Sequence, residues 1–121
     1  RGVVYLAPDD HHLGVDARRR IVLDAGAPIG GFRPAATFLF DSVGRHFGAR
    51  ALAVVLTGMG SDGVDGLRRL HAAGGRVLVQ DEASCVVFGM PGAAIAAGLA
   101  DEVVALDDIA KRICEAAGST P

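Results

Sequence analysis

The second half of the chain alternates short, almost wholly apolar runs with segments whose apolar residues recur every three or four positions. The apolar runs are at residues 51–57, 76–80 and 103–106. The segments of helical spacing are at residues 64–73, 91–97 and 107–117, with Asp107 as the expected N-cap of the last. Short apolar strands that alternate with helices are typical of a parallel sheet covered on both faces. The sequence therefore predicts a doubly wound α/β fold with a mainly parallel sheet.

The first half of the chain predicts smaller elements. Residues 2–7 (GVVYLA) form an apolar run that ends at Pro8, which predicts a strand buried on both faces. Residues 12–15 and 20–23 flank a charged turn and predict a small antiparallel hairpin. Pro34 is expected to be the first residue of a helix, a position that favours proline. The apolar side chains of that helix are Phe38, Leu39, Val43 and Phe47.

The composition suits one domain of a cytoplasmic protein. Of the 121 residues 50% are hydrophobic, which is enough for one packed core. The formal net charge is only −2, with both signs interspersed, so there is no electrostatic case for a nucleic acid or an anionic membrane as partner. No stretch approaches the ~20 apolar residues of a membrane-spanning helix, and no membrane insertion is expected. Cys85 and Cys114 form no CxxC pair and are interpreted as reduced thiols.

The turn after residues 51–57 contains glycines at the spacing of a dinucleotide-binding loop. Gly58, Gly60 and Gly63 fit G-x-G-x-x-G between a strand and a helix, and an acidic pair follows at residues 81–82. Asp62 is at odds with this hypothesis. Its carboxylate would repel a pyrophosphate bound ~4 Å away at the helix start by about 4 kcal/mol at a surface-like dielectric. Dinucleotide binding is therefore the disfavoured alternative.

Asp62 itself offers a second interpretation of the turn. Proteins of the α/β class carry their chemistry at the carboxyl ends of parallel strands, and N–H groups at a helix start favour a carboxylate. Such a group suits the acid of a Ser-His-Asp triad, which orients a histidine and stabilises its imidazolium during acyl transfer. N–H groups exposed by the tight glycines would bind an oxyanion. The residues alone leave a simpler role open, in which Asp62 only caps the helix that follows it.

Two long motifs resemble those of one enzyme family. Residues 56–63 (LTGMGSDG), followed by Gly66, are similar to the hallmark of the protein-glutamate methylesterases of bacterial chemotaxis. Residues 80–91 (QDEASCVVFGMP) are similar to the second signature of that family, at the right distance. Earlier landmarks extend the resemblance over essentially the whole chain: residues 5–8, 12–13 and 33–34. Residues 1–121 thus resemble the C-terminal portion of a methylesterase catalytic domain.

The resemblance implies a doubly wound α/β esterase with a Ser-His-Asp triad and no cofactor. Asp62 corresponds to the triad acid, and the backbone N–H of Met59 to a donor of the oxyanion hole. The implied substrates are glutamate γ-methyl esters on the cytoplasmic helices of a chemoreceptor, which yield glutamate and methanol. Some members also deamidate receptor glutamines. The methylated chemoreceptor is thus the implied partner, and a receiver domain, which members often carry upstream, is another.

The chain departs from the family pattern in two respects. Members usually have a Ser and an Asp just after the Arg-Pro pair, where this chain has Ala35 and Thr37, so local contacts are expected to differ there. The serine and the histidine of the family triad lie upstream of the region that this chain matches. We therefore expect both groups to precede Arg1 in a longer enzyme, and the 121 residues alone to be inactive. A truncated relative that acts as a non-catalytic binding module is the alternative.

No replacement for the missing groups is evident within the chain. None of the serines lies in a G-x-S-x-G turn: Ser42, Ser61, Ser84 and Ser119. Cys85 has no evident base beside it. His11 and His12 follow two aspartates but lack further ligands at a useful spacing, so no metal site is expected. His46 and His71 fall late in their predicted helices, on faces expected to be solvated.

Overall fold

The computed structural model describes residues 2–118 and is built around a three-stranded parallel sheet. β3 (Leu52–Val55) pairs with β4 (Arg76–Gln80), and β4 pairs with β5 (Glu102–Val104). Both pairings are parallel, and the strand order is β3-β4-β5. The predicted α/β class and parallel sheet are confirmed.

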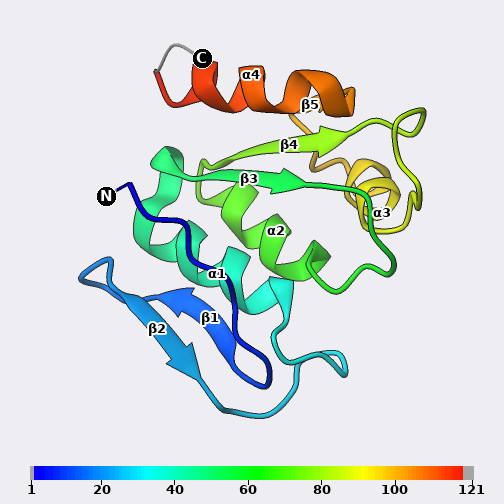
Figure 1. Ribbon diagram of the computed structural model, residues 1–121. Coiled ribbons are helices and arrows are strands. Elements are labelled where there is room, and N and C mark those ends of the chain that lie inside the picture. Colours follow the sequence, from blue (N-terminus) through cyan, green and yellow to red (C-terminus); the bar gives the residue numbers. More distant parts are fainter. Residues whose placement is uncertain (1, 119–121) are drawn as a thin grey trace.

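Within residues 2–118 four α-helices accompany the sheet. α1 (Ala36–Phe47) precedes β3, α2 (Val64–Ala72) connects β3 to β4, and α3 (Met90–Ala96) connects β4 to β5. α4 (Leu106–Ala116) follows β5. α1 and α2 lie on one side of the sheet and α4 on the other (Figure 1). Because β3 leads through a turn into α2, that turn lies at the carboxyl end of a parallel strand.

An antiparallel hairpin packs against α1, on the side away from the sheet (Figure 1). β1 (His12–Val15) pairs with β2 (Ile21–Asp24), with Leu13 opposite Leu23. Gly14 lies against α1, because a Cβ at this position would be 2.7 Å from the Ser42 hydroxyl. The predicted hairpin is confirmed, and a short 3-10 helix, η1 (Gly48–Arg50), joins α1 to β3.

The core lies between the sheet and the helices beside it. β3 and β4 each contribute alternate side chains, α2 contributes two leucines, and α3 contributes Met90 and Ala94. The buried members of this cluster are Ala51, Ala53, Val55, Leu67, Leu70, Val77, Val79, Met90, Ala94 and Leu99. This aliphatic packing holds the β3–α2 turn against the start of α3.

Three predicted details are wrong. Residues 2–7 form no strand: this segment has no regular structure, and the side chain of Val4 is 96% exposed. An apolar run becomes a strand only where another strand offers hydrogen bonds, and none does so here within the described residues. The helix expected from Pro34 begins at Ala36, because the backbone of Ala35 is extended, and the Asp62 carboxylate accepts the Ala36 N–H.

The last helix also begins differently from the prediction. It starts at Leu106, and the expected N-cap, Asp107, lies inside its first turn. Ala105 occupies the N-cap position and makes no side-chain hydrogen bond. The Leu106 N–H instead donates to the hydroxyl of Ser84 at 3.0 Å, so the capping oxygen comes from a distant loop.

Candidate active site

The turn between β3 and α2 is fixed by the loop that carries the second sequence motif. The Gly58 N–H donates to the Val87 carbonyl at 3.0 Å, and the Gly58 carbonyl accepts the N–H groups of Gly89 and Met90. Thr57 reinforces this contact, because its hydroxyl donates to the Val87 carbonyl and accepts the Val87 N–H. The two motifs therefore form one structural unit.

A buried glutamine anchors both motifs to β4. Gln80 is 0% exposed, and its side-chain carbonyl accepts the Thr57 N–H at 2.8 Å. The Gln80 amide group donates to the carbonyl and the hydroxyl of Ser84. The Ser84 hydroxyl donates in turn to the Asp81 carboxylate at 2.6 Å. Since buried polar groups are stable only when they are paired, this network fixes the base of the turn.

Met59 lies at the exposed tip of the turn, with a side chain that is 82% exposed. Its backbone N–H donates to no other group among the described residues. Gly60, the next residue, has a φ of +79°, a conformation that few residues other than glycine adopt. The turn thus presents an unoccupied N–H group close to the strand end, as an oxyanion-binding group requires.

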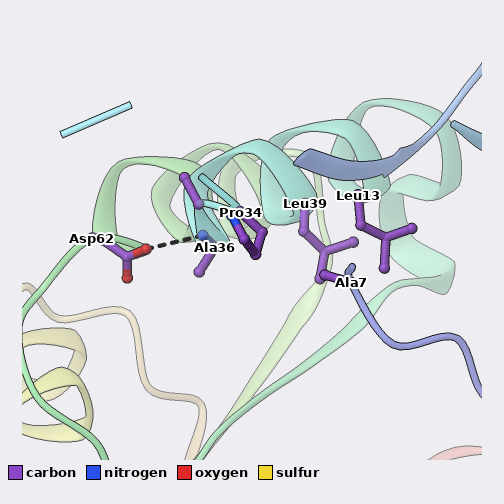
Figure 2. Close-up of a pocket in the computed structure, with 7 residues that line it drawn as sticks. Ala7, Leu13, Pro34, Ala36, Leu39 and Asp62 are labelled. Carbon is purple, nitrogen blue, oxygen red and sulfur yellow. Dashed lines mark hydrogen bonds between the residues drawn. The ribbon is translucent and has the colours of Figure 1, made fainter. Parts of the chain in front are cut away.

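Asp62 does not cap the helix that follows it. The N-cap residue of α2 is Gly63, which has no side chain that could cap the helix with a hydrogen bond. One carboxylate oxygen of Asp62, Oδ2, accepts the N–H of Ala36, the first residue of α1, at 3.0 Å (Figure 2). The simple capping role predicted as the alternative is therefore replaced by a bond to a different helix, whose positive N-terminal end faces the carboxylate.

The second carboxylate oxygen of Asp62, Oδ1, is left available. It accepts no hydrogen bond from any described residue, and no described cation forms an ion pair with it. In Figure 2 it points away from α1. Beside the carboxylate is an apolar pocket of about 260 Å³, lined by Ala7, Leu13, Pro34, Ala35, Ala36, Leu39 and Asp62. Asp62 is the only ionisable side chain in this lining.

None of the described histidines bonds to Asp62. His12 is 1% exposed; its Nδ1 accepts the Ala35 N–H at 3.2 Å, while Nε2 lies 2.9 Å from the Ala27 carbonyl. This arrangement assigns the proton of the neutral ring to Nε2. His71 bonds to Asp101 at 3.2 Å, far along α2 from the turn. His12 thus supports the start of α1 and has no free nitrogen for catalysis.

Ser61 directly precedes Asp62, but no described histidine bonds to this carboxylate, so the described residues do not assemble a Ser-His-Asp triad. The Ser42 hydroxyl accepts the Val15 N–H and donates to the Leu39 carbonyl. The hydroxyl of Ser84 is committed to the network around Gln80. Ser119 lies outside the described residues. Within residues 2–118 no cluster of three or more His, Cys, Asp or Glu side chains is arranged to hold a metal ion.

Sequence reasoning missed the residues that hold Asp62 in place. Thr37 donates its hydroxyl hydrogen to the Asp62 carbonyl, and the same hydroxyl accepts the Gly66 N–H at 3.2 Å. The departure from the family pattern at Ala35 and Thr37 was the one available signal. It marked the segment but did not show what the segment touches.

Comparisons with known proteins agree with this geometry. A family model described as CheB methylesterase matches residues 1–113. A protein-glutamate methylesterase/protein-glutamine glutaminase of Myxococcus xanthus is 58% identical over 95% of this chain. One from Anaeromyxobacter dehalogenans is 61% identical over 93% of this chain. In each case the match covers 33% of the relative, so the chain spans about a third of the length of these curated relatives.

A solved structure gives the same result. The catalytic domain of the CheB methylesterase of Thermotoga maritima superposes with a TM-score of 0.87 at 38% sequence identity. The match covers 92% of this chain and 60% of that domain. The sequence motifs, the strand-end turn and the superposition therefore lead to one conclusion: this chain belongs to the CheB methylesterase family.

Proposed function

We propose that Asp62 is the acid of a Ser-His-Asp triad that hydrolyses glutamate γ-methyl esters on a chemoreceptor. The observation that carries the proposal is the state of the Asp62 carboxylate. One oxygen is held by the start of α1, and the other is unbonded beside a small apolar pocket. A triad acid needs this combination, because it must be fixed and still accept an N–H from histidine.

In this mechanism the serine and the histidine come from the part of the protein that precedes Arg1. The serine oxygen attacks the ester carbonyl, and the histidine takes the serine proton. Asp62 Oδ1 accepts the other imidazole N–H and stabilises the imidazolium. The Met59 N–H stabilises the oxyanion of the tetrahedral intermediate. The histidine then protonates the departing methoxide, and water releases the glutamate by the same steps.

The relatives support the substrate class. Their names combine protein-glutamate methylesterase with protein-glutamine glutaminase, which are hydrolyses at the same side-chain carbonyl carbon. A cytoplasmic location follows from this substrate, because the modified receptor helices are cytoplasmic. A preceding receiver domain stays a prediction. No described helix is both long and apolar enough to cross a bilayer.

The start of α2 weighs against the dinucleotide alternative. A phosphate at a helix N-terminus needs free N–H groups. Here the Val64 N–H donates to the Ser61 carbonyl, and the Gly66 N–H donates to Thr37. The Asp62 carboxylate adds a negative charge to the same turn. The turn at residues 58–63 is therefore better suited to positioning the Asp62 carboxylate than to binding a nucleotide.

Replacing Asp62 with Asn in the full-length protein tests the proposal. Methanol release from methylated chemoreceptor should fall by about 10⁴-fold, because the amide cannot stabilise an imidazolium. The far-UV circular dichroism should be unchanged, because the amide oxygen still accepts the Ala36 N–H.

Residues 1–121 alone should release no methanol. Unchanged turnover in the Asn variant would reject the triad role, and turnover by residues 1–121 alone would reject an upstream nucleophile. Binding of receptor without turnover by the intact protein would favour the binding-module alternative.

A further inference from the structure

Thr37 is a buried polar residue placed between the starts of two helices. It is the second residue of α1 and is 7% exposed. Its hydroxyl donates to the backbone carbonyl of Asp62 and accepts the N–H of Gly66 in the first turn of α2. A hydroxyl group is needed for this pair of bonds, since it donates and accepts at the same time.

The two helix starts cap each other. The Asp62 carboxylate, which precedes α2, accepts the first N–H of α1. The Thr37 hydroxyl, on α1, accepts an N–H from the first turn of α2. Neither helix has a side-chain cap from its own N-cap residue. These reciprocal bonds supply acceptors for N–H groups that every helix start leaves unpaired.

Close backbone packing makes this arrangement rigid. A Cβ at Gly66 would lie 2.3 Å from the Thr37 carbonyl oxygen, so α2 touches α1 here without intervening side chains. A Cβ at Gly63 would lie 3.1 Å from the Ala36 side chain. The backbone of Asp62 directly precedes these two contacts and accepts the Thr37 hydroxyl, so a shift of Asp62 would strain the Thr37 bond or the helix contact.

We infer that Thr37 is a positioning residue of the esterase, which acts by fixing the backbone of Asp62 and hence the direction of its free carboxylate oxygen. The inference rests on the proposed function of Asp62. Thr37 influences the reaction only through its hydrogen bond to the backbone of Asp62. Its substitution should therefore lower kcat and leave KM nearly unchanged, because substrate binding does not use this bond.

The test compares three variants of Thr37 in the full-length protein. Thr37→Val keeps the shape of the side chain and removes the hydroxyl, and methanol release should lose about 10- to 100-fold in kcat, as expected for a catalytic group displaced by about 1 Å. Thr37→Ser keeps the hydroxyl and should stay within about two-fold of wild type. If the valine variant does not fold, Thr37→Ala removes the same group with less volume. Wild-type kcat in a folded Val or Ala variant, or an equal loss in the Ser variant, would overturn the inference.

A control and a double-mutant cycle separate positioning from stability. Ser42→Ala removes another bridging hydroxyl from α1 and should lower the thermal midpoint with kcat unchanged. In an Asp62→Asn background, Thr37→Val should lower kcat no further, because the group it positions is already lost. An equal loss of kcat in both backgrounds would show that Thr37 supports the fold and does not act through Asp62. Full turnover by Asp62→Asn itself would instead reject the proposed triad.

Discussion

Gly89 lies where the two motif loops of the candidate site touch. A Cβ at this residue would be 2.6 Å from the Gly58 carbonyl oxygen and 3.0 Å from the Met59 Cα. These neighbours are backbone atoms that carry the turn, so they cannot rotate out of the way as a side chain would. The absence of a side chain at Gly89 therefore lets the loop of the second motif approach the backbone of Gly58 and Met59 closely.

Gly89→Ala should displace the turn and reduce catalysis. We expect kcat for methanol release to fall at least about 10-fold, with a loss of about 1–3 kcal/mol in the free energy of unfolding. Gly92→Ala is the matched control, because the three atoms nearest to its added methyl belong to the ring of Phe88, a side chain that can move. Steady-state kinetics and urea titration of both variants measure the two effects. Equal kcat values would show that the contact at Gly89 does not shape the oxyanion site.

At this scale the sequence singles out Asp62 as the candidate acid but does not show which residues support it. The glycine turn at the end of an apolar run marks Asp62 but leaves a capping role open, and the resemblance to the methylesterases adds the expected role of triad acid. The partners of Asp62 are Ala36 and Thr37, more than 20 residues earlier. Short polar side chains give no signal of their distant contacts. Only the assembled helix pair shows why these residues matter.

At the scale of elements, three helices begin with acceptors supplied from elsewhere in the chain. Asp62 serves α1, Thr37 serves α2, and Ser84 serves α4. Local capping rules therefore misplaced the start of α1 and the cap of α4. The strands of the parallel sheet were predicted more reliably, because each corresponds to a short apolar run that can be recognised locally in the sequence. The exception, residues 2–7, is apolar without a neighbouring strand among the described residues.

Ser84→Ala should destabilise α4 more than Asp107→Ala. Removal of the Ser84 hydroxyl leaves the Leu106 N–H without its acceptor, which costs about 1–2 kcal/mol in the free energy of unfolding. Asp107 is exposed and offers only its charge to the helix start, worth about 0.5 kcal/mol. Urea denaturation of the two variants gives the comparison, and hydrogen exchange locates the change in α4. A larger effect at Asp107 would restore the cap that the sequence predicted.

At the scale of the whole molecule, both outer strands of the sheet have an unpaired edge in the described residues, and the edge of β3 lies beside an apolar groove. In the described residues β3 pairs only with β4, and its other edge borders a groove of about 840 Å³. The groove is lined by β3, by α1 and by Val4, Tyr5 and Leu6 of the irregular segment at residues 2–7. The Thermotoga domain is matched over only 60% of its length, which leaves it enough chain to cover such an edge.

Residues 1–121, as a free protein, should therefore associate through this edge. Light scattering should give a mass above the 12.4 kDa of the monomer, because an unpaired strand beside apolar side chains binds other strands. Leu56→Lys should reduce the association, since Leu56 lines the groove and is 46% exposed. Val103→Lys is the matched control: Val103 is 47% exposed, but it lies on β5 at the far edge. Equal effects of the two lysines would place the contact elsewhere.

The reciprocal capping of α1 and α2 also bears on the height of the catalytic barrier. The Asp62 side chain loses rotational entropy when the two helices dock. This entropy cost is therefore part of the free energy of folding and does not recur in each catalytic cycle. Under the proposed mechanism, the Asp62 carboxylate already has its direction in each turnover, and no reorganisation free energy is needed to orient it as positive charge develops on the imidazole. Preorganisation of the acid is in this sense a property of the helix pair, acquired before any substrate is bound.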